Sequence, residues 1–198
     1  MINPVLENIR DRRSVRSFND TDISESSIQT VLQAANQAPS AHNQQSWRFI
    51  VVRGAKKQDL SVLISKKAAE FPKTSSALLR MAARSISTAP VVVAIVNTGE
   101  MIRHASDLFS LDKQKSRDFF RTMEIQSSAA AIQNMLLAAT ALGISSVWLG
   151  VLILIKDDVL SFLEETEGEL MAVVPLGYSG KKGTPPSKKS LEGKVTYF

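Results

Sequence analysis

Cysteine is absent from this 198-residue chain, which excludes disulfides, thiolate metal ligands and cysteine nucleophiles. The chain has only two histidines, His42 and His104. They lie far apart with no carboxylates at ligand spacing, so we expect no metal site. Aromatic residues make up 6% of the sequence, and few lie near basic residues, unlike the interleaving typical of nucleic-acid binders. Metal chemistry, thiol chemistry and nucleobase stacking therefore have little support.

A stretch long enough to span a membrane is also missing. Residues 125–155 contain no charged side chain, but polar residues and Gly143 interrupt them, and the longest unbroken apolar run has 9 residues. A span needs roughly 18 or more. The first residues contain no apolar segment of a secretory signal, so we expect a cytoplasmic protein. A glycine-rich fingerprint of a Rossmann nicotinamide site is missing too.

The composition is that of an ordinary globular protein. Hydrophobic residues make up 44% of the sequence and charged residues 22%, which is enough to bury one good-sized core. The sequence shows no internal repeat, low-complexity segment or linker. We therefore expect one domain over residues 1–198.

The net charge of +5 is concentrated at the two ends of the chain. Residues 1–18 carry a net charge of +2 and residues 180–198 a net charge of +4, which leaves −1 for all the others. If the fold brings the two ends together, they create one strongly positive site.

Hydrophobic periodicity predicts a chain of both helices and strands. The fully apolar run 91–96 favours a central strand that is covered on both faces. Ser24 is a good N-cap for a helix that closes before Pro39, and Gly143 is a good stop for a long buried helix. This long helix is expected at about 117–142. Further helices are expected at about 3–12, 56–71, 75–87 and 157–164, and further strands at 47–52, 145–150 and 170–176.

Two other segments are less regular. Residues 97–115 mix apolar and charged side chains and fit either a lid or a pair of surface helices. The tail after Gly177 is rich in glycine, proline and lysine, which favours a flexible terminus. Its last residues, Val195, Tyr197 and Phe198, alternate as in a strand, which predicts that the tail packs on something.

A basic cluster near the N-terminus is the strongest chemical signal. Residues 12–18 (RRSVRSF) hold three guanidinium groups and two hydroxyls. An arginine fork matches phosphate oxygens, and serine hydroxyls and backbone N–H groups can complete the cradle. A solvated basic turn is the alternative for such a cluster taken alone.

A second motif, residues 39–47 (PSAHNQQSW), follows one predicted helix later, and the two together resemble the nitroreductase-like family of FMN-dependent NAD(P)H oxidoreductases. Three further stretches match this family in the same order. They are Gln133-Asn134 with the helix up to Gly143, residues 147–150 (VWLG), and Pro175 to Tyr178 with Lys188-Lys189. The resemblance therefore covers nearly the whole chain.

The resemblance implies an α+β fold in which helices wrap a mixed, mainly antiparallel sheet. It also implies an intertwined homodimer that holds two FMN molecules at its interface. Arg12 and Ser14 would lie at the FMN phosphate and ribityl chain with the Arg13 backbone beside them, and Arg16 would lie near the pyrimidine edge.

The remaining site residues implied by the resemblance come from other parts of the chain. Pro39, Ser40, Ala41 and Asn43 of the partner subunit would cover the ring, and Leu149 and Gly150 would present backbone to the flavin N5 region. Lys188 and Lys189 would close on the phosphate. Position 189 departs from the family, which commonly has arginine there, and lysine lacks the bidentate fork. No role follows for three further cations, Lys73, Arg80 and Arg84.

The predicted function is FMN-dependent transfer of a hydride from NADH or NADPH to an electron-poor acceptor such as a nitroaromatic or a quinone. No catalytic side chain is predicted, because the flavin carries the chemistry. Two alternatives remain: a flavin-binding module for sensing or storage, and a basic protein that binds nucleic acid or an acidic partner.

Overall fold

The computed structural model of the protein describes residues 3–105, 112–180 and 185–198. Part of the predicted lid and two of the tail lysines, at positions 181 and 182, therefore lie outside the described residues. The helices are α1 (Pro4–Asp11), α2 (Glu25–Asn36), η1 (Ala41–Asn43), α3 (Gly54–Lys67), η2 (Ala68–Glu70), α4 (Lys73–Thr88), α5 (Glu100–Ala105), α6 (Lys113–Ala141), η3 (Gly150–Ile155) and α7 (Lys156–Phe162). The strands are β1 (Trp47–Arg53), β2 (Val91–Asn97), β3 (Ser145–Ser146) and β4 (Glu169–Gly177).

The four strands form one antiparallel sheet in the order β1-β2-β4-β3. β2 lies between β1 and β4, and all seven of its residues are buried. This confirms the prediction of a central strand from the apolar run 91–96. An irregularity in the pairing with β4 falls between Ile95 and Val96, near the end of β2 that leads to Asn97.

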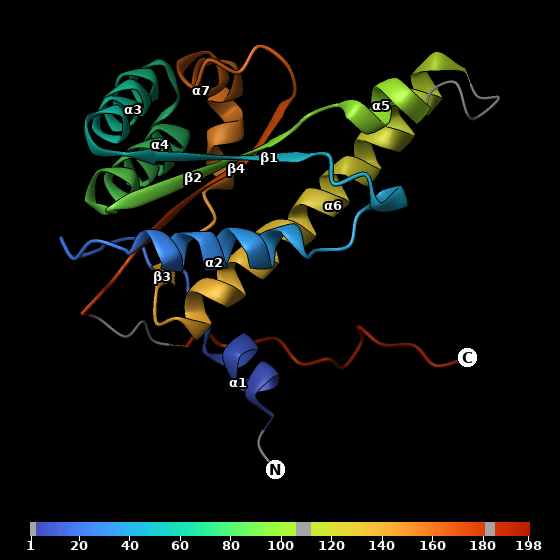
Figure 1. The fold of residues 1–198 in the computed structure, drawn as a ribbon, viewed down its shortest axis with the longest axis horizontal. Coiled ribbons are helices and arrows are strands. Elements are labelled where there is room, and N and C mark those ends of the chain that lie inside the picture. The colour runs from blue at the N-terminus through green and yellow to red at the C-terminus, as the bar shows by residue number, and fades with distance from the viewer. Residues whose placement is uncertain (1–2, 106–111, 181–184) are drawn as a thin grey trace.

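Helices cover both faces of the sheet (Figure 1). Val92, Ala94 and Val96 of β2 belong to a core cluster with residues of α3, α4 and α7. The alternate residues of β2 point to the other face, where they belong to a cluster with α2 and α6. Since side chains of a strand alternate between faces, a strand with two apolar faces needs a helical layer on each side. The observed architecture is thus the predicted α+β fold.

The long helix α6 supports one of these layers. Asp112 caps its N-terminus by accepting a hydrogen bond from the Lys115 N–H at 3.0 Å. Beyond its C-terminus, Gly143 has a φ of +71°, a left-handed conformation that glycine adopts without a steric penalty. The predicted buried helix and its glycine stop are confirmed, with the start four residues earlier than expected. No helix in the described ranges is long and apolar enough to cross a membrane.

The predicted strand at 145–150 is wrong over most of its length. Only Ser145 and Ser146 form a strand, Leu149 makes a single bridge to Val173 through its N–H at 3.0 Å, and η3 begins at Gly150. The outer edge of β3 is instead occupied by the N-terminal segment, because the Val15 N–H donates to the Ser146 carbonyl at 2.9 Å. A local apolar pattern could not reveal this distant partner.

The predicted strand-like end of the tail is also wrong for this single chain. Residues 185–198 form no strand, and every one of them is exposed (Figure 1). Leu191 and Tyr197 are 72% and 93% exposed. Within the described chain these apolar side chains therefore have no surface to cover them.

The last residue of the basic cluster, Phe18, packs closely against the backbone of Gly177 in the sheet. A Cβ atom at Gly177 of β4 would lie 2.7 Å from Pro90 Cδ and 2.8 Å from Phe18 Cδ1. Real side chains do not tolerate contacts this short in a packed core. Glycine at 177 thus allows Phe18 to pack on the sheet.

We expect Gly177→Ala to destabilise the protein by about 1–3 kcal/mol through overpacking. Gly180→Ala is a matched control, since a Cβ there would meet no atom within 4 Å, and it should change stability by less than about 0.5 kcal/mol. Urea unfolding of both variants measures the difference. Equal stability of the two variants would show that the Phe18 contact yields without cost.

Candidate functional site

The arginine cluster begins at the end of α1, where Arg13 closes the helix. Its Nη1 donates hydrogen bonds to the carbonyl oxygens of Arg10 at 2.6 Å and Arg12 at 2.8 Å. Arg13 Nε is buried and has no partner in the described structure. The Arg13 side chain therefore holds the turn in shape while leaving one buried donor unused.

The turn that follows is attached to one edge of the sheet. Ser14 forms a parallel bridge with Ser146 of β3, and the Asn19 N–H donates to the Tyr178 carbonyl at 2.8 Å, just beyond β4. Phe18 lies between these attachments and is buried. Ser14 and Arg16, in contrast, are exposed. The backbone is fixed while these side chains remain free to meet a ligand.

A pocket of about 940 Å³ lies over this turn. Its lining brings together both basic ends of the chain, which the charge distribution predicted could form one positive site. The lining includes Arg12, Arg13, Ser14, Arg16, Gln133 and Lys188. We refer to it as the basic pocket.

The sequence predicted no binding role for Gln133, although Gln133-Asn134 is one of the stretches that match the family. It is exposed on α6 next to Asn134, whose Nδ2 donates to the Ala34 carbonyl at 3.2 Å. Asn134 thus fixes α6 against α2, and Gln133 faces the basic pocket. An exposed amide in the charge-free second half of a helix that is otherwise largely buried there was the available signal.

Lys188 lines the basic pocket, but its neighbour Lys189 is not part of the lining found among the described residues. The three cations left without a role, Lys73, Arg80 and Arg84, are exposed on α4 and also do not line it. In the described ranges, no three His, Cys, Asp or Glu side chains lie close enough to hold a metal.

The loop with the second motif lies elsewhere in this chain. The Ala41 N–H donates to Ser127 Oγ of α6 at 3.2 Å, and Ala41 packs against Met101 and Phe120. Figure 1 shows this loop beside α6 on the side of α5, away from α1 and the arginine turn. Pro39, Ser40, Ala41 and Asn43 are accordingly outside the described lining of the basic pocket.

The backbone of this loop is strained. His42, Asn43 and Gln45 all have φ values of +51° to +53°, a left-handed region that non-glycine residues rarely adopt. Local hydrogen bonds hold it: the Gln45 N–H donates to Ser40 Oγ at 3.0 Å, and Gln45 Nε2 donates to Asn43 Oδ1 at 3.0 Å. Strain of this kind is concentrated at ligand sites and switch regions, so the loop is a functional candidate on its own geometry.

Leu149 and Gly150 lie at the start of η3, where the chain leaves β3. Leu149 is buried and tied to β4 by its N–H, whereas Gly150 is only partly buried. A Cβ at Gly150 would be 3.6 Å from Trp148 Nε1, an ordinary contact. Local packing therefore does not require glycine at 150.

A model of the nitroreductase family matches residues 9–178. A protein of Archaeoglobus fulgidus with the provisional name NADH dehydrogenase/NAD(P)H nitroreductase is 33% identical over 180 residues, which covers 87% of this chain and 84% of the relative.

Solved structures agree in fold. The FMN complex of a nitroreductase candidate from Desulfovibrio desulfuricans matches with a TM-score of 0.72 and 25% identity, covering 100% of this chain and 98% of the other. A BluB-like flavoprotein from Clostridium difficile matches with a TM-score of 0.76 and 27% identity, and each chain is covered completely. This chain belongs to the nitroreductase family.

Proposed function

We propose that the protein is an FMN-dependent oxidoreductase in which hydride passes from NADH or NADPH to an electron-poor acceptor such as a nitroaromatic or a quinone. The observation that carries this proposal is the basic pocket, in which the two ends of a nitroreductase-family chain meet. FMN is named with one solved neighbour, and NAD(P)H is part of the name of a relative.

The residues of the basic pocket fit FMN. Its volume of about 940 Å³ lies within the roughly 300–1,000 Å³ of small-molecule sites. Arg12, Arg16 and Lys188 supply positive charge for a phosphate. Two buried polar atoms at the turn, Arg13 Nε and Ser146 Oγ, have no partner in the described structure, and such atoms are uncommon unless a ligand or water satisfies them.

In this proposal Arg12 and Lys188 bind the phosphate, and Ser14 with the Arg13 backbone binds the ribityl chain. Arg16 lies at the pyrimidine edge, where a cation stabilises negative charge. Bound FMN supplies the hydride-accepting and hydride-donating chemistry. Leu149 and Gly150 contribute backbone next to it, and Lys189 adds positive charge at the outer edge.

We propose that the functional unit is a homodimer. In one chain the strained loop with Pro39, Ser40, Ala41 and Asn43 lies away from the basic pocket, so a second copy is needed to bring the loop over a flavin. The exposed apolar side chains of the tail, such as Leu191 and Tyr197, are suited to cover the same partner. A cytoplasmic location, with NAD(P)H available, fits this function.

Phosphate recognition is testable with FMN and riboflavin. Arg12→Ala and Lys188→Ala should each raise the FMN dissociation constant by roughly 10- to 100-fold, because each removes a charge-assisted contact. Riboflavin lacks the phosphate and should respond little to either change. Flavin titration of the apoprotein measures both affinities.

Lys189→Ala is the matched control, since Lys189 lies next to Lys188 but outside the described lining. It should have a smaller effect on FMN than Lys188→Ala. If riboflavin weakens as much as FMN in Arg12→Ala, the turn maintains the fold and does not recognise the phosphate.

Steady-state kinetics test the reaction. Because donor and acceptor would use the same flavin face in turn, varying NADPH at several concentrations of a quinone should give parallel double-reciprocal lines. Intersecting lines would contradict this order. A yellow protein that binds FMN but oxidises neither NADH nor NADPH with any acceptor would instead be a flavin-binding sensor or storage module.

Light scattering tests the dimer. The protein should have twice the mass of one chain, and replacing Leu191 and Tyr197 together with serine should shift it toward monomer on dilution, because buried apolar area is lost. Val62→Ser is the control, since Val62 is 67% exposed on α3. A double variant that dissociates no more readily than the control would show that the tail does not hold the dimer.

A further inference from the structure

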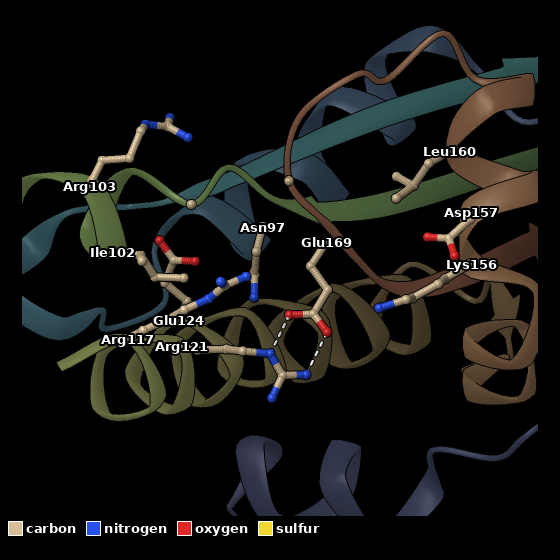
Figure 2. A pocket seen from close by; sticks show the side chains of 12 residues that line it. Asn97, Ile102, Arg103, Arg117, Arg121, Glu124, Lys156, Asp157, Leu160 and Glu169 are labelled. Carbon is tan, nitrogen blue, oxygen red and sulfur yellow. Dashed lines mark hydrogen bonds and ion pairs between the residues drawn. The ribbon is translucent and has the colours of Figure 1, made fainter. Parts of the chain in front are cut away.

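A second pocket lies at the other end of β2 and shares no described lining residue with the basic pocket. It is enclosed by the end of β2, α5, the first half of α6, and the starts of α7 and β4, and its volume is about 570 Å³. Figure 2 shows side chains from α6 and α7 extending into it from opposite sides. We call it the distal pocket.

Four cationic side chains line the distal pocket, and two of them are already engaged. Arg121 makes a bidentate ion pair with Glu169 at 2.8 and 2.6 Å. Arg103 has a looser contact with Glu167 at 3.7 Å. The other two, Arg117 and Lys156, have no hydrogen bond or ion pair within the described part of the chain.

The buried floor of the distal pocket offers another donor. Asn97 is 1% exposed; its Oδ1 accepts from Ser128 Oγ, and its Nδ2 contacts only the sulfur of Met171 at 3.1 Å. A thioether is a weak acceptor, so the Asn97 amide retains hydrogen-bonding capacity. Figure 2 shows this amide and the Arg117 guanidinium both pointing into the pocket. The Glu169 carboxylate, which Figure 2 shows between Asn97 and Lys156, is already paired with Arg121, so Arg117 and Lys156 leave positive charge that suits an anion.

Besides Glu169, two carboxyl groups line the distal pocket, and they determine which other ligand groups can bind there. Glu124 is 2% exposed and accepts from the Met101 N–H at 2.9 Å, and burial raises its pKa above the ordinary glutamate value. Asp157 lies beside Lys156 and has no ion pair among the described residues. A free carboxylate next to an anion site can accept hydrogen bonds from hydroxyl groups of the same ligand.

We propose that the distal pocket binds a phosphorylated sugar, with the phosphate held by Arg117, Lys156 and Asn97 and sugar hydroxyls donating to Asp157. The sugar phosphate is either free or part of a nucleotide. The described lining shares no residue with the basic pocket. Sugar-phosphate binding and flavin turnover are measured separately, so failure of this proposal and failure of the proposed oxidoreductase function are distinguishable.

The test uses the FMN-loaded full-length protein, whose flavin site is already filled, and isothermal titration with ribose 5-phosphate, ribose, inorganic phosphate and adenosine 2′,5′-bisphosphate. Ribose 5-phosphate should bind saturably and more tightly than either ribose or inorganic phosphate. Arg117→Gln and Lys156→Gln should each weaken it by roughly 10-fold or more, because each loses a charge-assisted contact. Asp157→Asn should weaken ribose 5-phosphate but not inorganic phosphate.

Lys66→Gln on α3 is the matched control and should bind like the unmodified protein. Tighter binding of adenosine 2′,5′-bisphosphate than of ribose 5-phosphate identifies a nucleotide as the source, and the reverse order identifies a free sugar phosphate. Absence of saturable binding, equal affinity for ribose 5-phosphate and inorganic phosphate, or affinities unchanged in Arg117→Gln and Lys156→Gln would each overturn the proposal. Retained flavin absorbance and an unchanged melting temperature confirm that the variants are folded.

Discussion

Burial of β2 on both faces and along both edges is the constraint on which the rest of the structure depends. Its seven residues are all inaccessible to water, so each face requires a helical layer and each edge a hydrogen-bonding partner. β1 and β4 satisfy the edges. α3, α4 and α7 cover one face, and α2 and α6 cover the other. The positions of both pockets follow from this arrangement.

The basic pocket forms where the sheet is least complete. β3 is only two residues long, and the N-terminal segment occupies its outer edge through Ser14 and Val15. A short edge strand that accepts a distant segment can fix a binding turn without burying its side chains. Phe18 packs against Gly177 and anchors this segment, so the flavin proposal depends on core packing as well as on charge.

In each pocket, some cationic side chains bind groups of the protein itself, but the groups that they bind differ. In the basic pocket, Arg13 donates hydrogen bonds to carbonyl oxygens at the end of α1, and Arg12 and Arg16 line the cavity. In the distal pocket, the Arg121–Glu169 pair forms a fixed wall, and Arg117 and Lys156 remain available. In both pockets some cations are engaged by the protein itself, and others face the cavity.

The sequence by itself determined most elements and part of the site. Apolar runs and caps are local signals, so β2, the Ser24 cap of α2 and the glycine stop of α6 could be predicted from neighbouring residues alone. The motif at 12–18 and the lysines of the tail indicated an anion site, because basic residues at both chain ends needed a common explanation.

Only the tertiary structure decided which of these residues meet. The 145–150 segment was predicted as a strand because its apolar pattern is local, whereas the segment that pairs with the outer edge of β3, Ser14 with Val15, comes from more than a hundred residues away. The tail reached the basic pocket through Lys188 but left Tyr197 exposed, since no local pattern states whether a surface belongs to the same chain or to another. The distal pocket was invisible in the sequence, because Arg117 and Lys156 each resemble an ordinary solvated charge until the fold places the first half of α6 and the start of α7 around one cavity.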